Sequence, residues 1–414
     1  MNEVATSEQV WATWILIGVY VAFVLYFVIR GALKTKSIKD YALGNIAFSP
    51  VAVGLALAAS MTSAATFIIN PGFIALYGIS GVLSLAIVLP LGAFISLVVL
   101  TKGFRKIGTD VKALTMAQWI GKRYNSKRFA TYFAFLSLLL ITFIVLICVG
   151  LTQVLSKSLN ADPLYVLIGI VVFIFGYMMF GGANSMVYTN TIQAVLMIVV
   201  AFILLGSGYQ HFSEGVHGFL AKLEAIDPVL ASSTNPTSFL FRDYFEIIFC
   251  QFIIGVAIVC QPHIITKSLL LKDEKAVNKY LTVGIVVEAL FFFVVFTGLY
   301  ARITFPDLTI NGEPIKLDGI MSTYVVKEFP VYLALLVILG LISAGVSTLE
   351  GLIQSVSTTM TEDIIKPLFG KKLYRSDNSD KKEVLVNKIV IISLGLISVL
   401  VSYQQILYPN LSVG

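Results

Sequence analysis

Charged residues are scarce in this sequence. Asp, Glu, Lys and Arg make up only 13% of its 414 residues, about half the share of a soluble domain. Hydrophobic residues reach 57%, and the mean hydropathy is +0.90. The apolar residues come in runs of roughly 20, the length that a helix needs to cross a hydrocarbon core of about 30 Å. A soluble domain is therefore excluded, and a helical membrane protein with many spans is predicted.

Cysteine, histidine and nucleotide-binding motifs are just as scarce. The three cysteines, Cys148, Cys250 and Cys260, fall inside apolar runs, where the side chain behaves as a small hydrophobe. The three histidines have no metal-ligand spacing, no nucleophile–base pair is evident, and the phosphate-binding pattern GxxxxGKS/T is absent. These absences argue against a disulfide framework and against an enzyme.

The apolar runs define ten candidate spans. They cover residues 11–29, 49–76, 80–101, 129–156, 163–182, 188–208, 244–266, 280–301, 331–357 and 388–406. No linker or low-complexity segment separates them, so residues 1–414 are expected to form a single transmembrane domain. The two long connections at 209–243 and 302–330 are expected to carry short surface helices.

The basic residues indicate the two sides of the membrane. Of the 29 Lys and Arg residues, 23 lie in or border the loops 30–48, 102–128, 267–279 and 358–388, and the other 6 lie on the opposite side. Since Lys and Arg concentrate in cytoplasmic loops, the N-terminus is predicted to lie outside the cell membrane. The asymmetry explains the net charge of +6 without a nucleic-acid partner. It also leaves no Lys or Arg deep in a span.

Two spans carry helix-breaking sequences. The second contains a small-residue stretch before Thr62 and Ser63 and then Asn70-Pro71-Gly72, and the seventh contains Gln261-Pro262-His263. Proline removes a backbone donor, and such a defect survives in lipid only when it is buried in protein or lines a wet cavity. Either proline alone is compatible with a simple kink. Together they occupy positions one and six of the series that starts at the second span, as in two inverted five-helix repeats with a site at their interface.

The ninth span is rich in hydroxyl groups. Ser347 and Thr348 follow Ala344 by one turn, and Glu350 comes two residues after Thr348. Hydroxyls in membrane helices most often bond back to the preceding turn or join helices. This adjacent pair, however, puts two hydroxyls and a carbonyl on one face. Because hard cations prefer oxygen ligands, these groups and the carbonyls of a broken helix are predicted to form a cage for Na⁺.

Four stretches carry a family resemblance: KDYALGNIAFSPVAVGLALAASMTSAATF, TMAQWIGKRYNSKRF, FGGANSMVYTNTIQAVLM and ISAGVSTLEGLIQSVSTTMTEDIIK. On these motifs the chain resembles the sodium/solute symporter family from about residue 11 onward. The segment CQPHIITKSLLLKDEKAV is most similar to the pantothenate-like and proline-like branches. Members of the family carry proline, pantothenate, monocarboxylates, sialic acids or sugars.

The resemblance implies an all-α, polytopic membrane fold. One extra helix at 11–29 precedes a first five-helix repeat at 49–208 and four helices of a second repeat at 244–406. The missing fifth helix of the second repeat makes us expect a fold truncated at the C-terminus, after Gly414.

The resemblance also implies the ligands. Na⁺ is expected at the carbonyls of Ala59, Thr62 and Ala344 and the hydroxyls of Ser347 and Thr348. The solute is expected at Ser63 and Thr66, which share a helix face, with further neighbours at Gln261, Thr142 and Gln153.

One departure from the family pattern concerns an acidic residue. Many relatives carry Thr-Asp-x-Ile-Gln in the fifth core helix, where this chain has Asn190 in place of the acid. Conversely, Glu350 stands where relatives with a second sodium have small hydroxyl residues. We hypothesise that the carboxylate has moved, that Glu350 faces Asn190, and that the pair serves a second cation or a proton. The alternative is a structural Glu that holds an inter-helix hydrogen bond, although an intramembrane acid is by default functional.

The sequence therefore predicts a Na⁺-coupled symporter, embedded in lipid and functional as a monomer, that brings a small organic solute into the cell. A proton-coupled symporter using Glu350 and a transporter-like sensor module are the alternatives. Without a deep Lys or Arg, strongly acidic solutes are disfavoured, and the apolar Ile254 and Ala257 disfavour sugars. A monocarboxylate or amino-acid-like solute is the favoured cargo.

Overall fold

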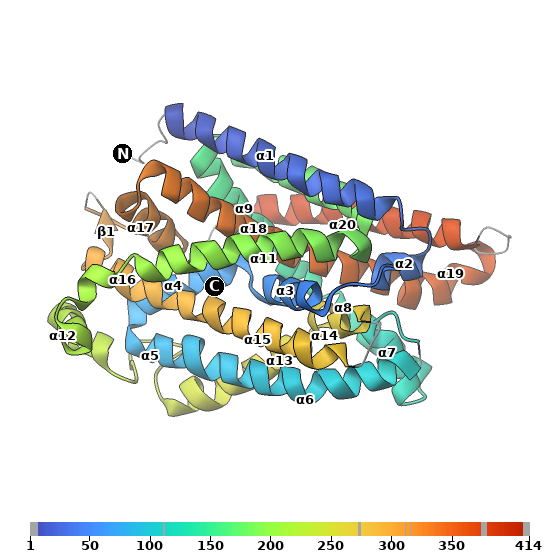
Figure 1. Ribbon diagram of the computed structural model, residues 1–414, viewed down its shortest axis with the longest axis horizontal. Coiled ribbons are helices and arrows are strands. Elements are labelled where there is room, and N and C mark those ends of the chain that lie inside the picture. Colours follow the sequence, from blue (N-terminus) through green and yellow to red (C-terminus); the bar gives the residue numbers. More distant parts are fainter. Residues whose placement is uncertain are drawn as a thin grey trace.

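The chain folds into a bundle of long helices that run side by side (Figure 1). The computed structural model describes residues 7–110, 112–271, 275–310, 312–315, 317–373 and 379–408. Within these residues, 8 helices are long and apolar enough to cross a membrane, and two bent pairs bring the number to as many as 10. They coincide with the ten predicted spans, and the chain is a multi-pass membrane protein. The expectation about Gly414 lies outside the described residues.

The spans are built from one or several helical segments each. In chain order they are α1 (Ser7–Ala32), α3 with α4 (Pro50–Met61, Ala64–Tyr77), α5, η1 and α6 (Ile79–Val82, Leu83–Val88, Leu89–Asp110), α8 with α9 (Lys127–Ser137, Leu140–Leu159), α10 (Pro163–Gly181), α11 (Ala183–Gly206), η4, α13, α14 and η5 (Phe245–Cys250, Gln251–Val259, Pro262–Ile265, Thr266–Leu270), α15, η6 and α16 (Ala276–Phe293, Val294–Phe296, Thr297–Thr304), α18 with η8 (Val331–Thr359, Met360–Ile365) and α20 (Ser379–Leu407). The division into repeats at 49–208 and 244–406 stays a prediction.

Shorter elements cover the two ends of the bundle (Figure 1). One end carries α2 (Ile38–Leu43), α7 (Met116–Arg123) and α19 (Lys366–Leu373), which come from three of the loops predicted to be cytoplasmic. The other end carries the elements of the two long connections: η2 (Tyr209–Phe212), α12 (Gly215–Ile226), η3 (Pro228–Ala231), β1 (Thr309–Ile310), β2 (Glu313–Pro314), η7 (Leu317–Gly319) and α17 (Ile320–Glu328). The expected surface helices are present, and β1 and β2 add one antiparallel two-residue pairing.

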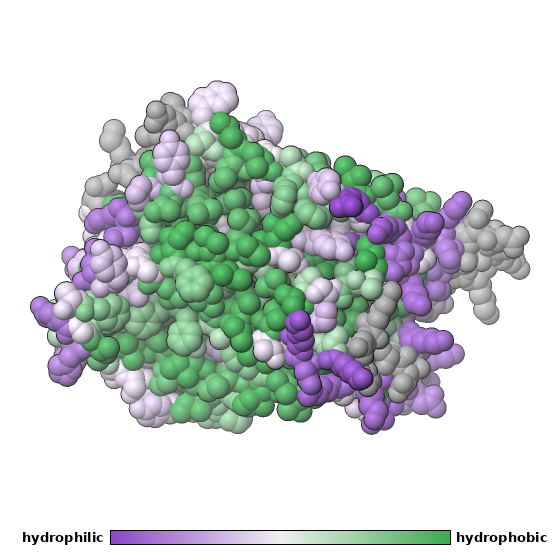
Figure 2. Space-filling view, viewed as in Figure 1, coloured by the Kyte–Doolittle hydropathy of each residue, from purple (hydrophilic) through white to green (hydrophobic). Residues whose placement is uncertain are grey.

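The surface has a broad apolar band between two polar ends (Figure 2). Only 22% of the apolar window of α1 is buried inside the protein, against 72% for the window of α18. Large side chains on α1, such as Trp14 and Ile15, are exposed, which is stable only against hydrocarbon. The extra helix α1 is therefore peripheral, and α18 runs through the centre.

Both predicted interruptions are present. The second span bends by 48° between α3 and α4, and the seventh bends by 56° between α13 and α14. In the second span Thr62 and Ser63 adopt extended backbone angles, whereas Pro71 lies inside α4. In the seventh span the extended residue is Gln261, as expected for a residue that precedes proline. The first break therefore depends on the residues around Thr62 and not on the proline.

Glycines bring α6 and α13 into close contact. A Cβ built on Gly255 would lie 2.2 Å from the Leu89 carbonyl oxygen, and one built on Gly92 would lie 2.4 Å from that of Phe252. Small residues let membrane helices approach closely enough for backbone packing. This contact holds the broken seventh span against the bundle.

We predict that Gly255→Ala lowers the melting temperature of the protein in detergent. The added methyl group forces the two helices apart, at a cost of about 1–3 kcal/mol. Gly169→Ala in α10 is the matched control, because nothing lies within 4 Å of its Cβ position, and it should leave the melting temperature unchanged or slightly raised. Equal melting of Gly255→Ala and wild type would contradict the tight contact.

Candidate functional site

The break in the second span meets the hydroxyl pair of α18. The Ser347 hydroxyl donates to the Ala59 carbonyl at 2.7 Å, and the Thr348 hydroxyl donates to the Thr62 carbonyl at 3.3 Å. Both hydroxyls also lie near the Ala344 carbonyl, at 3.0 and 3.1 Å. All five residues are at most 1% exposed. The structure thus brings together the five oxygens that the sequence analysis assigned to Na⁺, and their role as ligands stays a prediction.

The local geometry explains why these oxygens face one another. The last carbonyls of a helix have no partner in their own helix, and α3 ends at Met61, just before the extended Thr62. On α18, residues 347 and 348 follow residue 344 by one turn, so the three share a face. The result is a dry cluster of neutral oxygens without formal charge, which suits a weakly charged hard cation such as Na⁺.

A second polar layer adjoins this cluster. The Asn190 amide nitrogen on α11 donates to the Ser60 hydroxyl at 3.0 Å, and Ser60 in turn donates to the Ser347 carbonyl at 3.4 Å. The amide oxygen of Asn190 is buried and accepts no hydrogen bond within the described residues. Asn190 is therefore linked to the oxygen cluster, with one acceptor left open.

Glu350 does not bond to Asn190 as hypothesised. Its carboxylate accepts hydrogen bonds from Thr189 at 2.6 Å, from Gln193 at 3.3 Å and from Tyr177 on α10. Positions 189 and 193 share a face of α11, and the Asn190 side chain points toward Ser60 instead. The carboxylate on α18 is therefore held by Thr189 and Gln193 of α11, and Asn190 of the same helix faces Ser60.

The extra helix α1 contributes to the Glu350 cluster. The Gln193 amide nitrogen also donates to the Tyr20 hydroxyl at 2.9 Å, and the Gln193 amide oxygen is buried without a partner in the described part of the chain. The sequence analysis missed Tyr20 and Tyr177, because an isolated tyrosine in an apolar span carries no positional signal. Two amide oxygens, those of Asn190 and Gln193, thus stay open next to a buried acid.

The predicted solute residues are only partly brought together. Ser63 caps the start of α4 and is 7% exposed, as is Thr66 one turn later. Gln261 stands at the break of the seventh span, where the following helix α14 packs against α3 and α18. Gln153 is half-buried on α9, which packs against α4 and α18. Ser63 and Gln261 thus lie at the two breaks, Thr66 lies one turn into α4, and Gln153 lies on a helix that packs against α4 and α18.

Thr142 differs from the other four. It is exposed, and its hydroxyl donates to the Leu139 carbonyl of its own helix at 2.7 Å. It also lies about 16 Å along α9 from Gln153, at 1.5 Å per residue. The hydroxyl is satisfied locally, so the structure does not place Thr142 with the other candidate residues.

Glu288, a second intramembrane acid without a predicted role, joins the cluster through Thr62. The Thr62 hydroxyl lies 3.2 Å from each carboxylate oxygen of Glu288 on α15, which is 1% exposed. Thr62 therefore uses its carbonyl toward Thr348 and its hydroxyl toward Glu288. No sequence motif connects the two residues; the span pattern indicated only that Glu288 is intramembrane.

Two basic residues at the ends of spans are nevertheless buried in the protein. Lys267 and Arg105 are each 2% exposed. The seventh span continues past its break through η5 to Leu270, so that Lys267, which was assigned to a loop, is folded into the protein. Arg105 donates to the Leu271 carbonyl at 2.8 Å. The reason given for disfavouring acidic solutes therefore no longer holds.

A narrow pocket lies beside the oxygen cluster. A Cβ built on Gly351 would lie 3.5 Å from the His263 ring and 3.6 Å from the Ser60 hydroxyl. Gly351, His263 and Lys267 all line the pocket, whose volume is about 20 Å³, enough for about one water molecule. Leu114, Thr115 and Met116 form its wall at the end of the bundle that carries α7.

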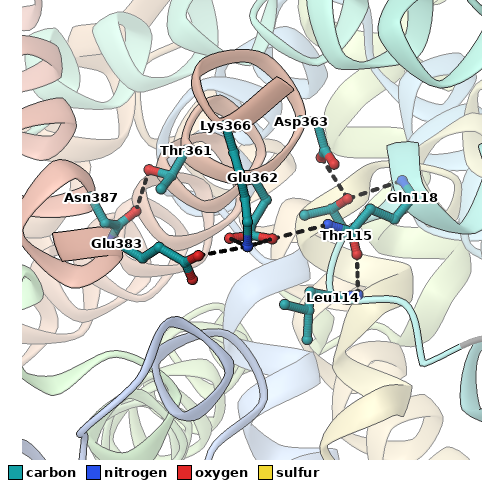
Figure 3. Close-up of polar contacts among 9 residues, drawn as sticks. All are labelled: Leu114, Thr115, Gln118, Thr361, Glu362, Asp363, Lys366, Glu383 and Asn387. Carbon is teal, nitrogen blue, oxygen red and sulfur yellow. Dashed lines mark hydrogen bonds and ion pairs between the residues drawn. The ribbon is translucent and has the colours of Figure 1, made fainter. Parts of the chain in front are cut away.

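Polar contacts close this end of the bundle (Figure 3). The Thr115 hydroxyl, which also lines the pocket, donates to the Asp363 carboxylate at 2.6 Å. The Lys366 ammonium bridges Glu362 and Glu383, at 3.1 and 2.8 Å. These bonds join the segment before α7, the η8 and α19 segment that follows α18, and the start of α20.

Comparison with known proteins identifies the architecture. A model of the sodium:solute symporter family matches residues 41–411. The chain belongs to the sodium:solute symporter family. The resemblance inferred from sequence is confirmed, and the family is one of transporters and not of enzymes.

Individual relatives of this symporter-family chain are distant. A sodium/pantothenate symporter of Haemophilus influenzae is 26% identical over 84% of this chain and 70% of its own length. The sodium/pantothenate symporter of Escherichia coli is 28% identical over 79% of this chain and 66% of its own length. The chain thus spans about two thirds of the length of these relatives.

A solved structure confirms the fold. A Na⁺-coupled sialic acid symporter in a substrate-bound, outward-open state matches with a TM-score of 0.77 and 19% identity, over 96% of this chain and 82% of that one. The all-helical, broken-helix transporter fold predicted from the sequence is therefore present.

We predict that Thr62→Val lowers the melting temperature of this family member. The substitution keeps the shape but removes the one hydroxyl that donates to the buried Glu288 in the described residues, and an unsatisfied buried polar group costs about 1–3 kcal/mol. Thr62→Ser should restore most of the loss, because it restores the donor. If Thr62→Val melts like wild type, the Thr62–Glu288 contact does not contribute to stability.

Proposed function

We propose that this chain is a Na⁺-coupled symporter that brings a small monocarboxylate or amino-acid-like solute into the cell. The observation that carries the proposal is the convergence of five buried, neutral oxygens where α3 breaks against α18. Such a cluster suits Na⁺, and the chain belongs to a family of sodium:solute symporters. In this proposal Ser63, Thr66, Gln261 and Gln153 contribute to the binding of the solute.

The proposed mechanism is alternating access. Na⁺ entering from outside joins the broken second span to α18, and the solute then binds next to it. Closure and rocking of the two repeats expose both ligands to the cytoplasm, where the Thr115–Asp363 and Lys366–Glu383 contacts must open for release. Coupling requires that each ligand favour the state that binds the other, and this effect is reciprocal. The membrane potential supplies about 2.3 kcal/mol per charge per 100 mV.

Orientation and assembly are part of the proposal. The four loops rich in Lys and Arg face the cytoplasm of the cell, the N-terminus lies outside, and one chain suffices for transport. In this orientation α12 and α17 cover the external end of the bundle, and α7 and α19 cover the internal end.

The first test is the melting temperature of the purified protein against NaCl, with choline chloride at the same ionic strength as baseline. Na⁺ at about 100 times its dissociation constant should stabilise the fold by roughly 2.7 kcal/mol. Ser347→Ala and Thr348→Ala should abolish the rise, because each removes one of the five oxygens. Ser398→Ala is the matched control, since this buried hydroxyl bonds only to the Leu394 carbonyl one turn before it. A rise that survives both cage substitutions would place Na⁺ elsewhere.

Within this function, we propose a second cation site next to Glu350. The open amide oxygens of Asn190 and Gln193 lie one turn apart on α11, beside the carboxylate. Two open amide oxygens and the carboxylate can accept a cation or, at the carboxylate alone, a proton. This observation also supports proton coupling as the second candidate function.

Glu350→Gln should therefore change the coupling of transport. In proteoliposomes that take up a substrate identified by screening in Na⁺, we expect a lower ratio of cation to solute, because the substitution removes the charge and keeps the shape. Tyr177→Phe, which removes one donor to the carboxylate but keeps the acid, should retain the wild-type ratio. Unchanged cation dependence and stoichiometry in Glu350→Gln would leave Glu350 with a structural role only.

A further inference from the structure

Lys267 is a buried lysine without a partner. Its side chain is 2% exposed, and its ammonium nitrogen makes no hydrogen bond within the described residues. None of the ion pairs among those residues includes it. A buried charge without a counter-charge is strongly unfavourable, and long polar side chains in membrane helices generally reach water or a partner. The position of Lys267 therefore requires a ligand or a function.

Two further unpartnered groups line the same pocket. The Nδ1 nitrogen of His263 and the Thr358 hydroxyl are both buried and form no hydrogen bond in the described part of the chain. His263 precedes Lys267 by four residues, and Thr358 comes from α18 on another wall. One ammonium, one imidazole and one hydroxyl thus lack partners within a single small space.

The lining of the pocket has a one-sided charge. The described residues that line it include Lys267 and His263 but neither Asp nor Glu. Glu350 acts on Lys267 electrostatically, yet its carboxylate is occupied by hydrogen bonds from Thr189, Gln193 and Tyr177. Asp363 is bonded to Thr115 and does not line the pocket. The described lining of the pocket therefore offers the Lys267 ammonium neutral oxygens only, and no carboxylate.

We propose that this pocket binds a small monovalent anion, either an inorganic halide or the carboxylate group of a solute. The Lys267 ammonium supplies the charge, and Thr358 and His263 supply further donors. Hydrogen bonds to an ionised group are about twice as strong as neutral ones. The volume of about 20 Å³ holds one small ion, and a carboxylate with a larger organic part requires the wall formed by Thr115 and Met116 to move.

The location of the pocket, between the oxygen cluster and the Thr115–Asp363 bond, suggests a role in transport. Gly351 separates it from Ser60, which is bonded to the Ser347 carbonyl, so an anion here lies next to the oxygen cluster on the side closed by the Thr115–Asp363 bond. For a solute with a carboxylate, the pocket is a station on the way to the cytoplasm. This role rests on the proposed function, whereas binding of the anion does not.

The test measures the melting temperature of the full chain in detergent, without Na⁺. Choline gluconate is the baseline, because gluconate is too large for the pocket, and chloride or acetate replaces it at constant ionic strength. We expect a saturable rise in wild type, no rise in Lys267→Met, and a wild-type rise in Lys279→Met, which removes an exposed lysine near the same end of the protein. Thr358→Val should weaken the apparent affinity about tenfold, the typical effect of one hydrogen bond to a charged group.

Each outcome decides the proposal. A rise with chloride alone assigns a halide site, and a rise with acetate alone assigns a carboxylate site; both support an anion site if Lys267→Met removes them. No rise with either anion, or an equal rise in Lys267→Met, overturns the proposal. If Lys267→Met fails to fold, Thr358→Val decides, and an unchanged affinity counts against the site. Na⁺ is absent throughout this test. A negative result therefore says nothing about the proposed Na⁺ site at Ser347 and Thr348, and a negative Na⁺ test says nothing about the anion site.

Discussion

The contact between the end of α3 and the hydroxyl pair of α18 is the interaction on which the rest of this structure depends. A broken helix in a membrane exposes carbonyls that lipid cannot satisfy. Here Ser347 and Thr348 satisfy the carbonyls of Ala59 and Thr62, so the break is stable only when it packs against α18. The same carbonyls are the ligands that Na⁺ would take. The cation and the two hydroxyl protons therefore compete for one set of oxygens, and this competition makes the contact sensitive to Na⁺.

Three polar connections extend from this contact. Ser60 leads to Asn190 on α11, Thr62 leads to Glu288 on α15, and Gly351 adjoins His263 and the pocket of Lys267. Each connection reaches a different helix, so a small shift at the break can displace side chains on α11, α15 and α14. Packed interiors transmit strain of this kind because they have low compressibility. That is the physical basis on which one bound ion can change the state of several helices.

The sequence was sufficient for the class, the ten spans and the two breaks, because hydropathy and helix-breaking residues are local signals. The five oxygens were found because the resemblance assigned them and because positions 344, 347 and 348 share a helix face. The partner of Glu350 was not predicted correctly, since the rotation of α11 decides whether 189, 190 or 193 faces the acid, and no local pattern fixes that rotation. Lys267 was missed for a similar reason: the charge count treats η5 as a loop, although it folds back into the protein. Thr142 was assigned by the resemblance alone, and the structure leaves it exposed and bonded within its own helix.

The buried charges set a constraint on the cargo. Glu288 and Glu350 lie close to the oxygen cluster, on the routes through Thr62 and α11, and Lys267 lies across Gly351 from it. In a medium of low dielectric constant an added charge is tolerated only near its opposite. A cation near the acids and an anion near Lys267 satisfy this condition together, because each neutralises a different part of the interior. Under the proposed function, a solute with one carboxylate, entering with Na⁺, fits this distribution better than either ion alone. Coupling between the two ligands then follows from the placement of the fixed charges and does not require direct contact between them.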